Sequence, residues 1–364
     1  SRAEQSRAEQ SRAEQSRAEQ SRAEQRNEYF DFIKGVLIFL VIWGHMLQKT
    51  NQSMVYESIW DNPIYKTIYT FHMPLFMILS GYLTFSSLQK RSGREFVKHR
   101  VIPLFQTVVA WGTIHLIVLL CLGKIHGLSE VVNSYTAGFW FIWAIVHCSI
   151  LIVLVDKARH TRYWYVIMIL SLGLSVFSLV PSKTAFMYPF FLIGYLINDL
   201  KLQIQKYTYV GCGILYIVTL KYMISQAGSM DFNLRFRDEP FYQIVSINFL
   251  RWWVGILGCI TIFAFLKWLF KYVGHTKLAG LISLLGRKTL SIYVMNVVLL
   301  EDLYGMCFYP IIVRKIGYNI LYLNAELFNL VLAPIMSLAF IIIVLYVDKV
   351  LSKTYSIRKI MYGK

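Results

Sequence analysis

Long apolar segments alternate with short polar loops along most of this chain of 364 residues. About ten of the apolar runs approach the roughly 20 residues that an α-helix needs to cross a bilayer. They lie near 31–49, 64–86, 101–122, 138–155, 164–180, 185–199, 207–224, 245–267, 288–306 and 325–348. The pattern predicts an all-α integral membrane protein, a bundle of about ten transmembrane helices.

Composition supports a membrane protein, because 56% of the residues are hydrophobic and only 16% are charged, against about 25% charged in ordinary globular chains. The net charge is +17, and the Lys and Arg residues cluster in alternate short loops. This bias predicts that both termini are cytoplasmic. It also indicates contact with membrane lipids rather than with nucleic acid. The five cysteines show no metal-ligand or redox spacing, so no metal is predicted.

The chain begins with the pentapeptide SRAEQ repeated five times. Its period of five produces no apolar helix face, so residues 1–25 are predicted to be a disordered or loosely helical tail. Residues 26–350 are then the transmembrane domain, and 351–364 a basic cytoplasmic tail.

The repeat can be encoded by a tandem of the five-base unit AGCAG, which would make it a slip-strand contingency tract of a phase-variable surface gene. The alternatives are an engineered tag and a plain peptide duplication. The coding DNA decides, since codons without a five-base tandem would exclude the tract.

Three ionisable residues lie within or beside the first apolar run, where a charge costs roughly 2.5–3.5 kcal/mol at the bilayer centre. Asp31 and Lys34 are spaced to form an ion pair on one helix face. Lys34 and His45 share that face, with roughly 16 Å of rise between them. The simpler interpretation is that Asp31 caps the helix, Lys34 extends to the interface and His45 lies at the opposite headgroup boundary.

The second run places His72 two residues before Pro74. A proline kink beside a histidine can open a polar site in a bundle, although a packing histidine bonded to a carbonyl is the simpler interpretation. The loop that follows contains Arg91, Arg94, Lys98 and Arg100. These cations could hold the phosphates of a nucleotide-like cofactor, or could reflect topology and anionic lipid alone.

Six motifs occur in order along the chain: FDFIKGVLIFLVIWGH, FHMPLFMILSGYLTF, FVKHRVIP, GFWFIW, YPFFLIGYLI and GRKTLSIYVMN. Together they resemble the membrane acyltransferase-3 family, from about Arg26 to the last apolar run. That family moves acyl groups, usually acetyl from acetyl-CoA, onto sugars outside the cytoplasm.

The resemblance implies catalytic roles for His45, His72, Lys34 and Asp31. The family's first-helix pattern is a basic residue, ten intervening positions and then His; the basic residue is usually Arg, and here it is Lys34. Lys98 and Arg100, with Arg91, Arg94 and Lys34, are implied to bind acetyl-CoA. The family often has His where this chain has Asn296, so a catalytic role is not expected at that position.

The function expected from these observations is O-acetylation of a surface polysaccharide or lipid-linked glycan, such as lipopolysaccharide or capsule, at the bacterial inner membrane. His45 would be the general base, or would carry the acetyl group in a two-step route. Two alternatives remain open at this point. One is a polytopic flippase or transporter of lipid-linked sugars, and the other is transfer of succinyl or another acyl group.

Overall fold

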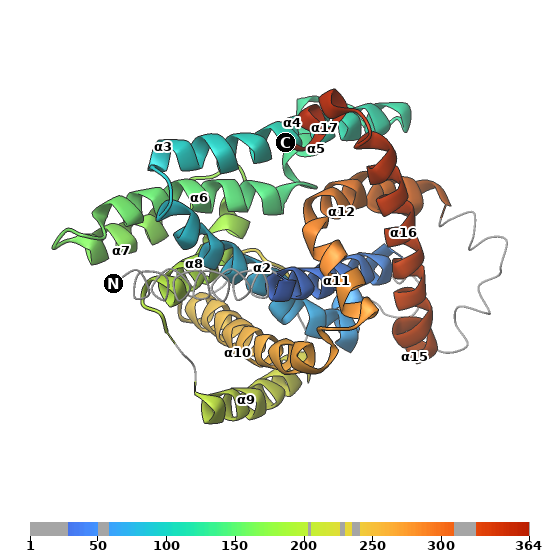
Figure 1. Cartoon of the computed structure of the whole chain (residues 1–364). Helices are drawn as coiled ribbons and strands as arrows, with labels where there is room; N and C mark the ends of the chain where they lie inside the picture. Colours follow the sequence, from blue (N-terminus) through green and yellow to red (C-terminus); the bar gives the residue numbers. More distant parts are fainter. Residues whose placement is uncertain are drawn as a thin grey trace, which may run out of the picture.

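The structure is a computed structural model of an all-helical chain. It describes residues 28–49, 58–202, 205–225, 230–234, 241–308 and 325–363, and these residues contain no strand. The repeat predicted to be a tail lies outside the described residues. Figure 1 shows the helices gathered around a central pair, the first helix and α2.

The helices follow the apolar runs. Their bounds are Glu28–Lys49 for the first helix, Pro63–Leu88 for α2, Gly93–Phe96 for α3, Ile102–Cys121 for α4, Leu128–Thr136 for α5, Trp140–Ala158 for α6, Trp164–Leu174 for α7, Pro181–Asp199 for α8, Lys206–Ser225 for α9, Phe241–Val273 for α10, Lys277–Arg287 for α11, Thr289–Met295 for α12, Ala325–Leu327 for α15, Ala333–Leu351 for α16 and Tyr355–Tyr362 for α17. A 3-10 turn, η1, spans Ile59–Asp61, and three π-helical segments span Val97–Val101 (η2), Asn296–Phe308 (η3) and Phe328–Leu332 (η4).

Seven helices among the described residues are long and apolar enough to cross a membrane, and α11 with the helix after it would make an eighth although they are bent by 63°. Each of the ten predicted runs lies wholly or largely in a helix, which confirms the all-helical prediction and is consistent with a membrane protein, while the count of ten spans stays a prediction. The fifth run is shorter than predicted, because α7 ends at Leu174 rather than near 180. Turns follow it, Ser178 Oγ accepts from Val180 N at 3.2 Å, and Pro181 opens the next helix.

The first helix and α2 form the centre of the bundle. Of their apolar stretches, 61% and 67% are buried, against 11% for α9. Because α9 exposes most of its apolar side chains, it is a peripheral helix with a surface suited to lipid. Most of the surface of the two central helices therefore faces protein, which is where membrane proteins place polar groups.

Glycines allow the central helices to approach their neighbours closely. A Cβ atom on Gly81 of α2 would lie 1.9 Å from the carbonyl oxygen of Phe191 in α8, and one on Gly194 of α8 would lie 1.9 Å from that of Ile78. Asn198 Nδ2 then donates to Tyr82 O across the same interface at 2.7 Å. Small residues at a helix crossing are the usual device for such contacts in membranes.

Helix α11 crosses the first helix at a second close contact. This contact lies in the half of the first helix that we predict to be cytoplasmic. A Cβ on Gly286 would lie 1.8 Å from Asp31 O, and one on Gly35 would lie 1.9 Å from Ile282 O. The backbone around Asp31 and Lys34 is therefore fixed by the motif that contains Gly286.

The basic segment near the end of the chain includes a helix. Helix α17 packs on α4, where Gln106 Nε2 donates to Lys359 O at 3.1 Å. Its last residue, Tyr362, is buried at 5% exposure, so this helix contributes a side chain to the interior of the bundle. Figure 1 shows α17 beside α4.

Replacing Gly81 by Ala should destabilise the protein, since the added methyl group meets a backbone carbonyl that cannot turn away. Overpacking costs typically about 1–3 kcal/mol, so we expect a melting temperature several degrees lower in detergent. Gly173→Ala is the matched control, because a Cβ there meets nothing within 4 Å. A Gly81→Ala protein that melts at or above the wild-type temperature would contradict the packing described here.

Candidate active site

Two cavities lie end to end within the bundle. The His45 cavity has a volume of about 230 Å³, and the Arg100 cavity has a volume of about 350 Å³. We name each after one lining residue. Val41, Met73 and Tyr293 line both cavities, so the two spaces meet at these three side chains.

One face of the first helix runs through both cavities. Lys34 and Ile38 line the Arg100 cavity, Val41 lies at the junction, and His45 lines the other cavity. Their spacing of four, three and four residues is that of a single helical face. The structure thus confirms that Lys34 and His45 share a face, and it places a different cavity beside each.

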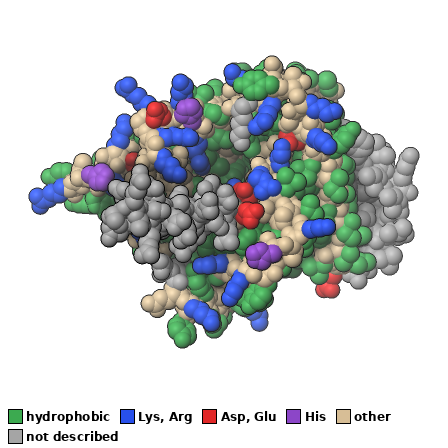
Figure 2. Space-filling view, viewed as in Figure 1, with side chains coloured by type: hydrophobic (Ala, Val, Ile, Leu, Met, Phe, Trp, Pro, Cys, Tyr) green, Lys and Arg blue, Asp and Glu red, His purple; other side chains and the backbone are tan. Residues whose placement is uncertain are grey.

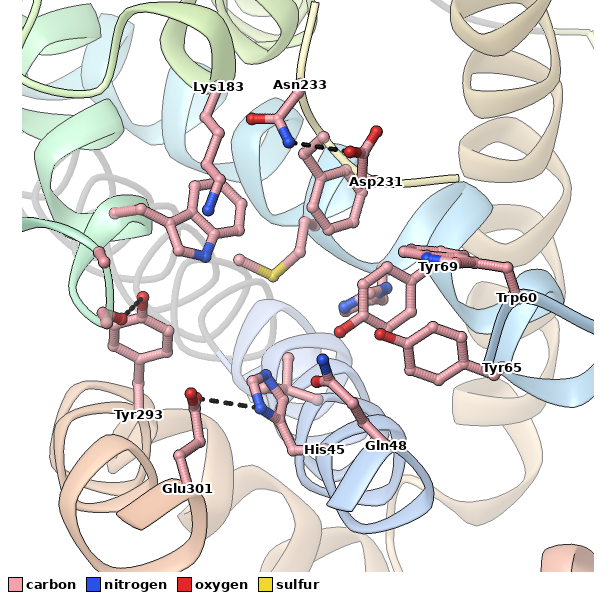
Figure 3. Close-up of a pocket in the computed structure, with 17 residues that line it drawn as sticks. His45, Gln48, Trp60, Tyr65, Tyr69, Lys183, Asp231, Asn233, Tyr293 and Glu301 are labelled. Atoms are coloured by element: carbon pink, nitrogen blue, oxygen red, sulfur yellow. Dashed lines mark hydrogen bonds and ion pairs between the residues drawn. The ribbon is translucent and has the colours of Figure 1, made fainter. Parts of the chain in front are cut away.

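His45 faces a carboxylate from a distant part of the chain. Its Nδ1 lies 3.0 Å from Glu301 Oε1, and both side chains are largely buried. Figure 3 shows this pair on one side of the cavity. Because Nδ1 faces the carboxylate, Nε2 is the ring nitrogen left for a substrate, and the carboxylate can balance a proton that the ring acquires.

Glu301 is itself held by Asn296, whose Nδ2 donates to Glu301 Oε1 at 3.3 Å. Both residues lie in the π-helical segment Asn296–Phe308. In a π-helix residues i and i+5 are neighbours, whereas an α-helix would turn them to different faces. Asn296 is fully buried. It therefore positions the acid that faces His45.

A second histidine–carboxylate pair lies beside the first. His115 Nε2 of α4 is 2.9 Å from Asp302 Oδ2, and His115 Nδ1 is 2.7 Å from the carbonyl oxygen of Ser134 in α5. The pair ties η3 to α4 and α5 at the residue after Glu301. Sequence reasoning gave His115 no role.

His72 also lines the His45 cavity. Its Nδ1 is 2.6 Å from Ile68 O, and a carbonyl can only accept, so Nδ1 carries the hydrogen and Nε2 is the acceptor. The carbonyl bond of the simpler sequence interpretation is therefore present, and the ring also borders the cavity.

The rest of the His45 cavity wall is aromatic and polar. Tyr69 stacks on Phe232 with ring centroids 5.3 Å apart, and Lys183 Nζ lies 4.8 Å above the Trp140 ring. Figure 3 shows Lys183, Asn233 and Asp231 across the cavity from His45 and Glu301, with Tyr65 and Tyr69 at its side. Such a wall combines flat apolar surfaces with hydrogen-bonding groups.

A charged pair and an arginine whose Nε is buried border the Arg100 cavity. Lys34 Nζ is 2.6 Å from Asp31 Oδ1, which confirms the predicted ion pair. Arg100 and His99 line the same cavity. Arg100 Nε is buried without a hydrogen-bond partner among the described residues. A buried, unpartnered donor of this kind is suited to an anionic ligand.

The other predicted cofactor-binding residues lie outside this cavity. Arg91, Arg94 and Lys98 are exposed and do not line it. Figure 2 shows Lys and Arg side chains gathered around a hollow in the face that it presents. Within the described residues, no cluster of three His, Cys, Asp or Glu side chains could hold a metal ion.

Tyr293 is the most firmly held of the three shared residues. Its hydroxyl donates to Gly138 O at 3.0 Å and accepts from Phe141 N at 3.3 Å. Tyr293 belongs to the motif GRKTLSIYVMN, and Gly138 and Phe141 belong to GFWFIW. Two of the six motifs therefore meet at the junction of the cavities.

Comparison with known proteins agrees with this arrangement of motifs. A family described as an acyltransferase domain matches residues 27–349. The chain belongs to this acyltransferase family. The match confirms the resemblance to the acyltransferase-3 family and covers every residue that lines the two cavities except Tyr362 of α17.

Two curated relatives carry the name nodulation protein NolL. The protein of Sinorhizobium fredii is 31% identical over 179 residues, 47% of this chain and 48% of the relative. That of Mesorhizobium japonicum is 31% identical over 182 residues, again 47% and 48%. The matches thus span about half the length of these relatives. No solved structure matches the chain.

Proposed function

We propose that this member of the acyltransferase family is a membrane O-acetyltransferase. It moves acetyl from cytoplasmic acetyl-CoA to a hydroxyl of an extracytoplasmic surface glycan. The observation that carries the proposal is the meeting of two cavities beside His45. One is largely apolar and includes Lys34 and Arg100, and the other has an aromatic and polar wall. Such an arrangement lets two substrates reach one histidine from opposite ends.

Acetyl-CoA would enter the Arg100 cavity. Arg100 and Lys34 supply positive charge for its phosphates, and guanidinium suits phosphate particularly well. The exposed Arg91, Arg94 and Lys98 would attract the anionic donor to the mouth. The apolar lining beyond, including Phe76, Phe141 and Ile145, suits the pantetheine arm. Asp31 would hold Lys34 in place.

The acetyl thioester would reach the junction and the acceptor hydroxyl would enter the His45 cavity. His45 Nε2 takes the hydroxyl proton as the oxygen attacks the thioester carbonyl. Collapse of the tetrahedral intermediate breaks the carbon–sulfur bond, and the departing thiolate regains the proton from the imidazolium. Glu301 stabilises that imidazolium, and His72 lies where it can support the reaction.

The acceptor is a glycan of the cell surface, such as lipopolysaccharide or capsule. Tyr69 and Trp140 each stack on Phe232, so the three rings form an apolar wall beside which a sugar ring can lie. Asn233 and Lys183 offer polar groups to its hydroxyls. The repeat at 1–25 supports a phase-variable surface substrate. We place the protein in the bacterial inner membrane with about ten spans and both termini in the cytoplasm. Family membership supports this transferase over the transporter of lipid-linked sugars.

On the donor side, Arg100→Gln should raise the KM for acetyl-CoA about tenfold or more, since a hydrogen bond to a charged group contributes about 1.5–3 kcal/mol. The rate at saturating donor should change little. The matched control is Arg162→Gln, whose side chain is exposed and lines neither cavity. Transfer rates measured in membrane vesicles at varied acetyl-CoA concentrations give the KM and the maximal rate of each variant. Equal KM values for the two variants would exclude Arg100 as a donor-binding residue.

For the chemical step, His45→Ala should slow acetyl transfer by about 10²–10⁴-fold. Glu301→Gln should lower kcat without changing the KM for acetyl-CoA, because it acts through His45, and Glu301→Asp should restore part of the rate. Glu130→Gln on α5, which lies outside both cavities, should behave as wild type. Full transfer by the His45→Ala protein at equal membrane abundance would refute the assignment.

A further inference from the structure

The junction between the cavities is built from three buried side chains of unlike character. Val41, Met73 and Tyr293 are 2%, 3% and 6% exposed. Val41 lies one helical turn before His45 on the same face, and Met73 follows His72 in α2. The junction is therefore within a turn of the histidine to which we assign the chemistry, and any group that passes between the cavities must pass these side chains.

This geometry constrains the acyl group of the donor, and the constraint rests on the function proposed above. A thioester that enters from the Arg100 cavity presents its acyl group first and its sulfur last. Its carbonyl must reach His45, so the acyl chain comes to lie at the junction or just beyond it. The size of the junction then decides which acyl chains can place their carbonyl correctly.

The three side chains differ in their conformational freedom. Tyr293 is fixed by two hydrogen bonds to the chain around Gly138, and Val41 is a β-branched residue with a stiff side chain on a central helix. Met73 is unbranched and has three rotatable bonds. Met73 is thus the side chain whose volume and conformation set the free width.

We propose that Val41, Met73 and Tyr293 form an acyl-size filter, in which Met73 is the main determinant of selectivity for acetyl over longer acyl groups. The filter acts on the same donor that Arg100 binds, but it acts on the opposite end of that donor. It therefore makes no contribution to recognition of the CoA moiety. A change at Met73 should alter which acyl group is transferred, whereas a change at Arg100 should alter the affinity for every acyl-CoA equally.

Met73→Ala tests the filter directly, and Met77→Ala is its matched control. Met77 lies one turn further along α2, is fully buried and lines neither cavity. Both variants remove the same atoms from the same helix, so a general loosening of the bundle would affect them alike. Val41→Ala is a milder second variant, which keeps the test available if Met73→Ala fails to fold.

The measurement uses the full chain in membranes of the source bacterium, with radiolabelled acetyl-, propionyl- and butyryl-CoA as donors. Its readout is label incorporated into the extracted surface polysaccharide. We expect the ratio of butyryl to acetyl kcat/KM to rise at least tenfold in Met73→Ala and to rise in Val41→Ala, since each methylene in an apolar pocket changes specificity by about 10–200-fold. The ratio in Met77→Ala should equal that of the wild type.

Two results would overturn the filter while leaving the transferase intact. One is wild-type acetyl transfer with an unchanged ratio in both Met73→Ala and Val41→Ala. The other is an equal rise in Met77→Ala, which would indicate a loosened bundle. A wild-type protein that transfers no acyl group from any donor would instead overturn the proposed function, and the filter with it.

Discussion

The pairing of His45 with Glu301 is the interaction on which the rest of the site depends. Two ionisable groups inside an apolar bundle lose hydration, and each is tolerated because the other faces it at 3.0 Å. Asn296 binds the carboxylate, and the adjacent His115–Asp302 pair ties the same π-helical segment to α4. The π-helical geometry brings Asn296 and Glu301 to one face, so backbone form and site chemistry are linked.

Five of the six sequence motifs supply residues that line the two cavities, and the other one, YPFFLIGYLI, contains the Gly194 that packs α8 on α2. Gly81 and Gly194 let α2 and α8 approach, Gly286 sets α11 against the first helix, and Tyr293 bonds to the segment at Gly138. None of these four contacts involves a reacting group. They fix the frame in which Val41, Met73 and Tyr293 lie between the cavity that contains Arg100 and the aromatic cavity beside His45.

Features that depend on residues close together in the sequence could be predicted from the sequence. The helical runs, the Asp31–Lys34 ion pair and the face shared by Lys34 and His45 all follow from helix periodicity, and the structure has them. Glu301 was missed, although two adjacent carboxylates within an apolar run were a visible signal. Its partner is far away in sequence, and its orientation depends on a π-helix that periodicity does not predict. Among the loop cations, only the fold distinguishes the cavity-lining Arg100 from the exposed Arg91, Arg94 and Lys98.

We propose that acetyl crosses the membrane through the junction beside His45. The most direct test is vectorial transfer in sealed right-side-out vesicles of the source bacterium, with isotopically labelled acetyl-CoA either enclosed or added outside. We expect labelled acetyl on the external glycan from enclosed donor alone, and none with His45→Ala at equal abundance. Equal use of external donor, or wild-type transfer by His45→Ala, would contradict it.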